Sequence, residues 1–248
     1  MRIAPGLTGW RRGSGPPLVL IHGVGLRADA WAPLAERLDG LEAIAIDMPG
    51  HGGSAPAMGE GLRAYADPIG EALRAIGPCA LAGHSMGAMV ALDLAARMPG
   101  AVTAVAALNA VFRRPPEAAR AVRARAAALS GTAPGDPSET LRRWFPAAGP
   151  HAAACREMLL AADPLAYKRA YSVFAAEDGP AEAALRRIEC PSLFVTGSEE
   201  PNSTPAMSRA MAALAPRGRA RIIDGARHMM PMTHAAELAP QLRALAGA

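Results

Sequence analysis

The segment Cys79–Gly87, which reads Cys-Ala-Leu-Ala-Gly-His-Ser-Met-Gly, decides the fold of this chain. Its first four residues form a short apolar run that predicts a buried strand, and Met86–Arg97 predicts a helix. Between them lies Gly83-His84-Ser85-Met86-Gly87, a G-x-S-x-G pattern typical of a sharp strand-to-helix turn that exposes the serine hydroxyl. Glycines at both ends remove side chains that would clash in so tight a turn. We therefore expect Ser85 to be a nucleophile; a serine that merely caps the helix is the alternative.

On both sides of this segment, short apolar runs alternate with helical patterns. Strands are expected at Leu18–Ile21, Ala43–Ile46, Cys79–Ala82, Val102–Leu108, Leu193–Thr196 and Ala220–Ile223. Helices are expected at Asp29–Leu38, Leu62–Ile76, Met86–Arg97, Pro205–Leu214 and His234–Ala246. This alternation is typical of an α/β fold in which helices flank a mostly parallel central sheet.

Residues 113–187 interrupt the alternation. They are helical in composition, contain no convincing strand, and separate two consecutive predicted strands. They hold five of the ten aromatic side chains, and their twelve Arg and Lys outnumber eight Asp and Glu, so the net charge of +4 falls entirely here. Because a plain loop of this length is uncommon in a compact domain, we predict a helical cap at 113–187 on a core formed by residues 1–112 and 188–248.

A serine nucleophile needs a base, and the base needs an acid that orients it. His228 follows the last predicted strand and Glu200 follows the strand before it. Both should therefore emerge at the carboxyl edge of the sheet together with Ser85, where ligands bind in open α/β folds. We predict His228 as the base and Glu200 as the acid, with Glu199 and Asp224 as alternatives for the acid.

The negatively charged oxygen formed by serine attack needs two backbone donors aimed at one point. The N–H of Met86, directly after the nucleophile, is one candidate. The second is the N–H of Val24 in the glycine-rich stretch His22-Gly23-Val24-Gly25, which follows the first predicted strand. We expect His22 to brace this loop through hydrogen bonds rather than to exchange protons.

Composition narrows the class of protein. The chain has 248 residues, of which 51% are hydrophobic and 4% aromatic, enough for a buried core without disulfides or metal. The sequence has no stripe of Lys and Arg of the kind expected in a nucleic-acid-binding protein. The longest nearly apolar run, Ala101–Val111, is too short to span a membrane. No apolar signal segment is visible, and Cys79, Cys155 and Cys190 form no C-x-x-C pair. We expect a cytoplasmic protein with free thiols that needs no cofactor and no metal.

These motifs resemble those of the α/β-hydrolase superfamily over nearly the full chain. The matching pieces are LVLIHGVG (18–25), IAIDMPGHGGS (44–54), LAGHSMG (81–87), LFVTGSEEPNSTP (193–205) and DGARHMM (224–230). The resemblance implies an α/β-hydrolase fold with its cap inserted after the sixth strand. It also implies that Asp47 to Ser54 shape the pocket without taking part in catalysis. The chain is similar to the small capped branch of 3-oxoadipate enol-lactonases, meta-cleavage-product hydrolases and carboxylesterases.

Two departures from the family pattern stand out. Glu200 occupies a position where the family usually has Asp, and Asn109 occupies the alternative acid position after the preceding strand, where it cannot carry a charge. Met229 follows the histidine, where meta-cleavage hydrolases commonly have tryptophan.

The resulting expectation is a serine hydrolase that cleaves a small carboxylic ester, lactone or thioester through an acyl-enzyme on Ser85. A C–C bond hydrolase of a vinylogous diketone acid and a non-enzymatic ligand-binding protein are alternatives. A third is a dinucleotide-binding protein, because residues 23–28 fit G-x-G-x-x-A and Asp47 lies about twenty residues further on. Arginines in the cap, Arg113 and Arg114 first, favour a substrate that carries a carboxylate; solvated arginines on the surface are the alternative. The sequence does not indicate an oligomeric state.

Overall fold

A central sheet runs through the computed structural model, which describes residues 1–247; Ala248, the last residue of the predicted core segment 188–248, lies outside the described residues. Its strands are β1 (Arg2–Ala4), β2 (Leu7–Gly13), β3 (Pro17–Ile21), β4 (Glu42–Ile46), β5 (Cys79–His84), β6 (Val102–Leu108), β7 (Ser192–Gly197) and β8 (Gly218–Ile223). They are arranged in the order β1-β2-β4-β3-β5-β6-β7-β8. The six strands from β3 onward run parallel to one another, whereas β2 pairs antiparallel with β4 and β1 with β2. The predicted mostly parallel sheet is confirmed.

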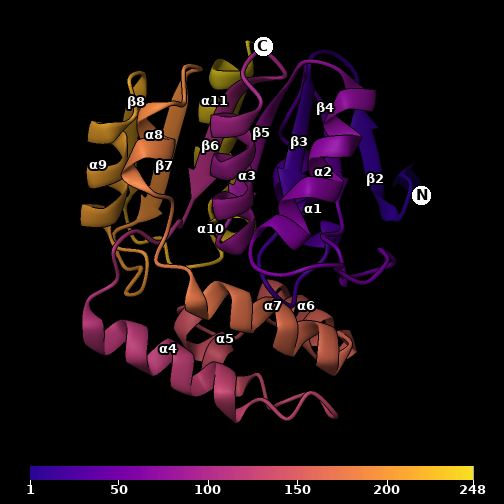
Figure 1. Ribbon diagram of the computed structural model, residues 1–248, viewed down its shortest axis with the longest axis vertical. Helices are drawn as coiled ribbons and strands as arrows, with labels where there is room; N and C mark the ends of the chain where they lie inside the picture. Colours follow the sequence, from indigo (N-terminus) through magenta and orange to yellow (C-terminus); the bar gives the residue numbers. More distant parts are fainter. Residues whose placement is uncertain (248) are drawn as a thin grey trace.

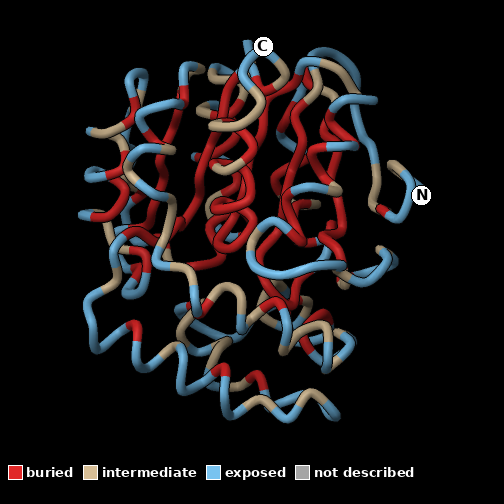
Figure 2. Tube along the Cα trace, in the orientation of Figure 1, coloured by how far each residue is buried: buried red, intermediate tan, exposed pale blue. Residues whose placement is uncertain are grey.

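Helices cover both faces of this sheet (Figure 1). The helical segments are η1 (Ala28–Trp31), α1 (Ala32–Ala35), α2 (Arg63–Ile76), α3 (Met86–Arg97), α4 (Pro116–Ala128), α5 (Ser138–Trp144), α6 (Pro150–Ala161), α7 (Pro164–Ala176), α8 (Glu182–Arg186), α9 (Pro205–Leu214), α10 (Met230–Thr233) and α11 (Ala235–Ala246). The buried clusters place α2, α3, α8 and α9 on one face, and η1, α1, α10 and α11 on the other. Figure 2 shows the central strands β3 to β7 almost entirely buried between these layers.

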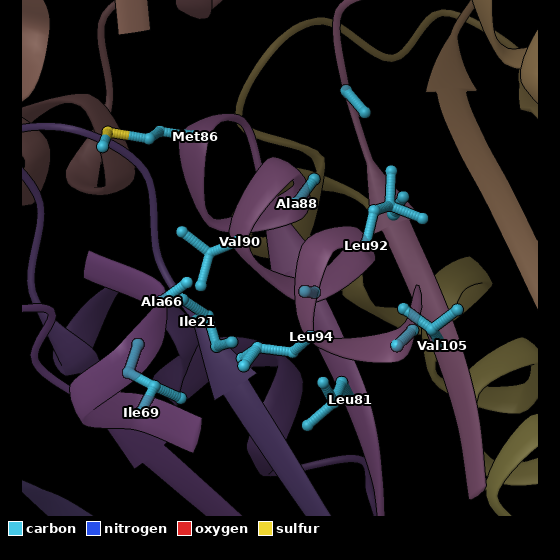
Figure 3. Packing of buried hydrophobic residues seen from close by; sticks show 14 of the residues in the cluster. Ile21, Ala66, Ile69, Leu81, Met86, Ala88, Val90, Leu92, Leu94 and Val105 are labelled. Carbon is cyan, nitrogen blue, oxygen red and sulfur yellow. The ribbon is translucent and has the colours of Figure 1, made fainter. Parts of the chain in front are cut away.

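Along β5 the two faces of the sheet differ in side-chain size. In β5, Leu81 points to the α2–α3 face and Ala80 and Ala82 to the α11 face, as the alternation of a strand requires. Figure 3 shows the first face, where Leu81 and Val105 of the sheet lie near Leu94 of α3. Aliphatic side chains and alanine therefore supply most of the core, which explains how the chain is so apolar with so few aromatic residues.

Helices α4 to α7 lie together beyond one end of the sheet, between β6 and β7 in the chain (Figure 1). Within this group α4 packs against α7 and α5 against α6. The much shorter α8 packs instead against α3 and α9 of the helical layer. The division into a core and a cap at residues 113–187 remains our proposal, with α8 lying against the core.

Several predicted elements differ from the observed ones. Sequence reasoning missed β1 and β2: β1 has only three residues, and the strand Leu7–Gly13 buries only Leu7 and has no apolar run. The predicted helix Asp29–Leu38 was wrong as a single element: it consists of the short 3₁₀ turn Ala28–Trp31 and the four-residue helix Ala32–Ala35. The terminal helix begins at Ala235 rather than His234.

Candidate active site

Ser85 lies at the turn between β5 and α3. Its backbone has φ 57° and ψ −119°, an uncommon conformation for a residue with a side chain. A Cβ at Gly83 would overlap the Gly87 carbonyl oxygen, and one at Gly87 would overlap the carbonyls of Ile21 and His22. The Ser85 N–H donates to the Leu108 carbonyl at 2.9 Å. The turn thus holds a strained serine in place, as a nucleophile at this position requires.

His228 and Glu200 meet next to this turn. His228 Nδ1 lies 2.8 Å from Glu200 Oε2, and the Glu200 side chain has no exposed surface. Glu200 Oε1 accepts from the backbone N–H groups of Asn202 at 2.8 Å and Ser203 at 3.3 Å. Burial opposes ionisation of Glu200, but the facing His228 and the two backbone donors outweigh it, so the pKa of this carboxyl lies below its ordinary value. The carboxylate is therefore ionised and accepts the Nδ1 proton of His228.

The two alternative acids lie elsewhere. The Glu199 side chain is 50% exposed and accepts from Arg227 Nε at 3.0 Å. Asp224 is exposed and accepts from the Ser198 hydroxyl at 3.0 Å. Neither carboxylate is hydrogen-bonded to His228, so of the three candidates Glu200 alone has the geometry of an orienting acid.

The loop that carries His228 is tied to the sheet through its own carbonyl. This oxygen accepts from Asn109 Nδ2 at 2.7 Å and from His84 Nε2 at 2.8 Å. Burial, reinforced by the neighbouring His228, lowers the pKa of His84 to about 3, so His84 is neutral. Asn109 follows β6 with φ 51°, and its Oδ1 accepts from the Thr196 hydroxyl at 2.9 Å. Asn109 thus fixes the His228 loop from the alternative acid position, a contact that sequence reasoning missed.

The loop after β3 approaches Ser85 closely. A Cβ on Gly23 would lie 3.1 Å from the Ser85 Cβ, so a larger residue would crowd the nucleophile. His22 accepts from the Met48 N–H at 2.9 Å and donates from Nδ1 to the Gly23 carbonyl at 2.7 Å. Burial, together with the nearby His51, lowers the pKa of His22 to about 3. His22 is therefore neutral and braces the loop through two hydrogen bonds.

The two predicted oxyanion donors flank the serine. Val24 lines the same cavity as Ser85, and Met86 begins α3 immediately after it (Figure 3). Within residues 1–247 neither backbone N–H has a protein acceptor. Both groups are thus available as donors to a ligand. The Ser85 hydroxyl likewise forms no hydrogen bond to His228 in the described part of the chain.

A cavity of about 360 Å³ opens between Ser85, His228 and the helices α4, α5 and α7. The helices contribute Trp144, Tyr167 and Tyr171, and the Trp144 indole stacks on the His228 ring. The volume lies in the range of small-ligand sites, which enclose their ligand largely with apolar and aromatic side chains. Sequence reasoning placed these aromatic residues in the cap without showing which of them face Ser85.

Three arginines line this cavity. Arg114 is 5% exposed and donates to the carbonyls of Phe174 and Glu177 as well as to Asp178, so its donors are committed within the protein. Arg125 donates to the Tyr171 hydroxyl at 3.2 Å, and it forms no ion pair with a carboxylate in the chain up to Gly247. The sequence-based candidates were Arg113 and Arg114. Arg114 reaches the cavity, and the exposed Arg113 pairs with Glu182 instead.

Arg143 is the third arginine of the cavity, and it lies one residue before Trp144 on α5. Its guanidinium pairs with Glu139 at 3.0 Å, a carboxylate that is 70% exposed. Such a solvent-exposed pair is weak and leaves the arginine able to bind a second anion. Arg125 and Arg143 were not singled out from the sequence, because nothing in the composition of a helix tells which of its arginines face inward.

The residues that suggested a dinucleotide site are used inside the fold. Asp47 accepts from the Ala28 N–H at 2.7 Å, the Thr8 hydroxyl at 2.8 Å and the Gly53 N–H at 3.2 Å. Burial opposes its ionisation, but these three donors hold the pKa of the carboxyl below its ordinary value. A carboxylate with its acceptors occupied in this way cannot serve as a ribose ligand.

In residues 1–247 no group of three or more His, Cys, Asp and Glu side chains could hold a metal ion. The three cysteines are free thiols, and burial raises the pKa of Cys79 and of Cys155 to about 12. No helix in the same range has the length and apolar character needed to cross a membrane.

Known proteins resemble this chain along most of its length. The model of the Alpha/beta hydrolase family matches residues 18–241. The (E)-2-((N-methylformamido)methylene)succinate hydrolase of Acinetobacter baylyi is 38% identical over 231 residues, which cover 90% of this chain and 88% of that protein. A malate-bound esterase from Thermogutta terrifontis superposes with a TM-score of 0.84 at 27% identity, covering 96% of this chain and 92% of the other.

A second solved structure, an E-2-(acetamidomethylene)succinate hydrolase, superposes with a TM-score of 0.77 at 26% identity and covers 95% of this chain and 92% of the other. The predicted family resemblance and the predicted fold are thereby confirmed, and the relatives are hydrolases and esterases. The chain is a hydrolytic enzyme that belongs to the alpha/beta hydrolase family.

Proposed function

We propose that this enzyme is a serine hydrolase in which Ser85 is the nucleophile, His228 the base and Glu200 the acid. The observation that carries the proposal is the buried 2.8 Å contact between His228 Nδ1 and Glu200 Oε2, in a cavity that His228 shares with the strained Ser85. An ionised carboxylate on Nδ1 fixes the tautomer of the ring, which leaves the Nε2 lone pair free to accept a proton. That is the state a base needs before serine attacks.

The oxyanion is held by the N–H groups of Val24 and Met86. Both donors lack a protein acceptor in the described chain, and α3 directs the positive end of its dipole towards the same point. Preorganised donors of this kind stabilise the charge that develops as the carbonyl becomes tetrahedral, and removing one typically costs about 10²- to 10³-fold in rate.

The reaction then runs in two halves. His228 takes the proton of Ser85 as Oγ bonds to the substrate carbonyl, and the resulting imidazolium protonates the leaving group as the carbonyl re-forms on the acyl-enzyme. Water enters, His228 removes its proton, and the tetrahedral intermediate collapses to release the acid and restore the serine hydroxyl. In apo structures such hydrogen bonds are often long or unaligned, which accounts for the missing bond between Ser85 and His228.

The preferred substrate is a small ester, lactone or thioester that carries a carboxylate. Arg125 faces the cavity with no carboxylate partner among the described residues, and the partner of Arg143 is largely exposed, so an anion between them meets two guanidinium groups. The malate bound to the Thermogutta esterase is, like the proposed substrate, a small molecule that carries a carboxylate. The aromatic side chains would enclose the rest of the substrate.

An amide of the (amidomethylene)succinate class is a second candidate. It is favoured by the named activity of the Acinetobacter relative, whose 38% identity extends over 90% of this chain. Its two carboxylates suit the same arginines, and cleavage of its amide follows the same acyl transfer, with His228 protonating nitrogen instead of oxygen.

A substrate panel tests both candidates. It contains monomethyl and dimethyl succinate, a lactone and a thioester of similar size, an (acylamidomethylene)succinate and a vinylogous diketone acid. Since a hydrogen bond to a charged group contributes about 1.5–3 kcal/mol, we expect kcat/KM about 10- to 150-fold higher for the monoanionic ester than for its neutral diester. Equal values would refute the anionic substrate, and cleavage of the diketone acid alone would move the enzyme to C–C bond hydrolysis.

A further inference from the structure

Trp144, the last residue of α5, stacks on the imidazole of His228. The ring centroids lie 5.1 Å apart and the planes are inclined by 26°. Trp144 also lines the cavity that contains Ser85. The indole thus covers one side of the proposed base, although the two residues lie far apart in the sequence.

Phe145, the residue after Trp144, interacts with both neighbours of His228 in the chain, Arg227 and Met229. Arg227 donates to the Phe145 carbonyl at 3.3 Å, and Glu199 pairs with the same guanidinium. On the other side Phe145, which is buried, packs in one apolar cluster with Met229. Arg227 and His228 thus contact Phe145 and Trp144, and Met229 lies in the same apolar cluster as Phe145.

We propose that Trp144 is a positioning residue for His228: its stacked indole sets the plane of the imidazole and stabilises the imidazolium that forms when Ser85 is deprotonated. This inference rests on the proposed function, in which His228 is the base. An indole face attracts a cation placed over it more strongly than any other aromatic side chain. It therefore favours the charged ring over the neutral one.

The other groups around His228 set the background for this effect. Glu200 holds Nδ1, the neutral His84 donates to the backbone carbonyl, and Arg227 is the preceding residue in the chain. Arg143 lies beside Trp144 and lines the same cavity. None of these groups occupies the place of the indole, so an apolar residue at position 144 would remove its attraction and leave the remaining charges unchanged.

The inference also connects the base to the α4–α7 helices. Ser85, His228 and Glu200 all come from the ends of sheet strands or from the loops after them, whereas Trp144 comes from α5. If these helices move away from the core to admit substrate, the indole leaves His228. The imidazolium of His228 is then stabilised by the indole only when α5 packs against the core.

The direct test is a histidine NMR titration in the Ser85→Ala background, which lacks the proposed nucleophile. The His228 signal is identified by its loss in His228→Gln. Trp144→Leu should lower the pKa of His228 by about 0.4 to 1.5 units, equal to about 2- to 30-fold in its protonation constant. Trp144→Phe, which keeps an aromatic face, should fall between Leu and Trp. Phe174→Leu, which removes a cavity ring that does not stack on His228, should leave this pKa unchanged.

Activity provides the second readout. With Ser85 intact, the acidic limb of the kcat/KM profile should shift by the same amount in Trp144→Leu and be partly rescued in Trp144→Phe. An unchanged or higher pKa of His228 in Trp144→Leu overturns the inference. An equal loss of kcat/KM in Trp144→Leu and Trp144→Phe, with no change in the pH profile, overturns it as well. Retained activity in Ser85→Ala would instead refute the proposed function, while the NMR titration would still decide the role of Trp144.

Discussion

Replacing Glu200, the proposed acid, by glutamine exchanges one oxygen for an NH₂ group on the residue that is hydrogen-bonded to His228. In the native protein Oε2 accepts from His228 and Oε1 accepts from the N–H groups of Asn202 and Ser203. Glutamine has one acceptor and one donor group at these two places, so it cannot satisfy both sides at once. Because the side chain has no exposed surface, water cannot replace the missing partner.

The two possible orientations of the glutamine have different costs. If NH₂ faces the backbone, the N–H groups of Asn202 and Ser203 are left opposite another donor, and the buried Ser203 N–H alone costs about 1–3 kcal/mol. If NH₂ faces His228, the ring needs only to move its proton from Nδ1 to Nε2, which is the cheaper choice. An Nε2 that already carries a proton cannot accept one from Ser85. We therefore expect a loss of about 10³- to 10⁴-fold in kcat with the fold intact.

The rate constant for inactivation by a fluorophosphonate measures this loss without knowledge of the substrate, because phosphonylation needs the same deprotonation of Ser85. Glu199→Gln is the matched control: Glu199 is half-exposed and paired with Arg227, so its rate should stay near that of the native enzyme. A loss below about tenfold in Glu200→Gln would refute the reasoning. A larger loss in Glu199→Gln than in Glu200→Gln would move the acid to Glu199.

Three further predictions follow from the site and its surroundings. Ser85→Ala and His228→Ala should each lower kcat by about 10³-fold or more with unchanged circular dichroism, and near-native turnover in either variant would exclude its assigned role. Arg125→Gln should raise KM for a monoanionic ester by about tenfold or more and leave the matching neutral diester unaffected; an equal effect on both esters would show that the arginine does not bind the carboxylate. The third concerns pH, because burial lowers the pKa of His22 and of His84 from 6.5 to about 3. Between pH 3 and pH 6.5 the unfolded chain binds more protons than the folded protein. Each of the two histidines should therefore lower the free energy of unfolding by about 1.4 kcal/mol per pH unit as the pH falls below 6.5. Urea unfolding from pH 7.5 to 5 measures this slope, and a flat profile would show that the two rings are not buried in the neutral state.

Much of the core could be predicted from the sequence because its elements carry strong local patterns. The predicted bounds of β6, α3 and α9 match the observed ones, since each is a compact apolar run or an amphipathic stretch with clear ends. The strand Leu7–Gly13 was not predicted because a strand with exposed arginines lacks that pattern. Its pairing with β4 depends on the neighbouring strand rather than on its own residues.

Some residues of the site could be predicted from local sequence patterns, and others could not. Ser85, Glu200 and His228 each follow a strand of a parallel sheet, and strand direction alone brings such positions to one edge. Trp144, Arg125 and Arg143 come from helices, and whether they face the cavity depends on how α4 and α5 are rotated and packed. From the sequence, Asn109 was noted only as an uncharged residue at the alternative position of the acid. Its contact with the His228 carbonyl joins residues that are 119 positions apart, which no local pattern reveals.

The central claim is that Ser85 is the activated nucleophile of this enzyme, and mapping of a fluorophosphonate adduct by peptide mass spectrometry tests it most directly. The folded enzyme should carry one adduct, on Ser85, and the adduct should be absent from Ser85→Ala and from enzyme unfolded before labelling. An adduct on another residue, or no adduct on folded enzyme that turns over substrate, would contradict the account.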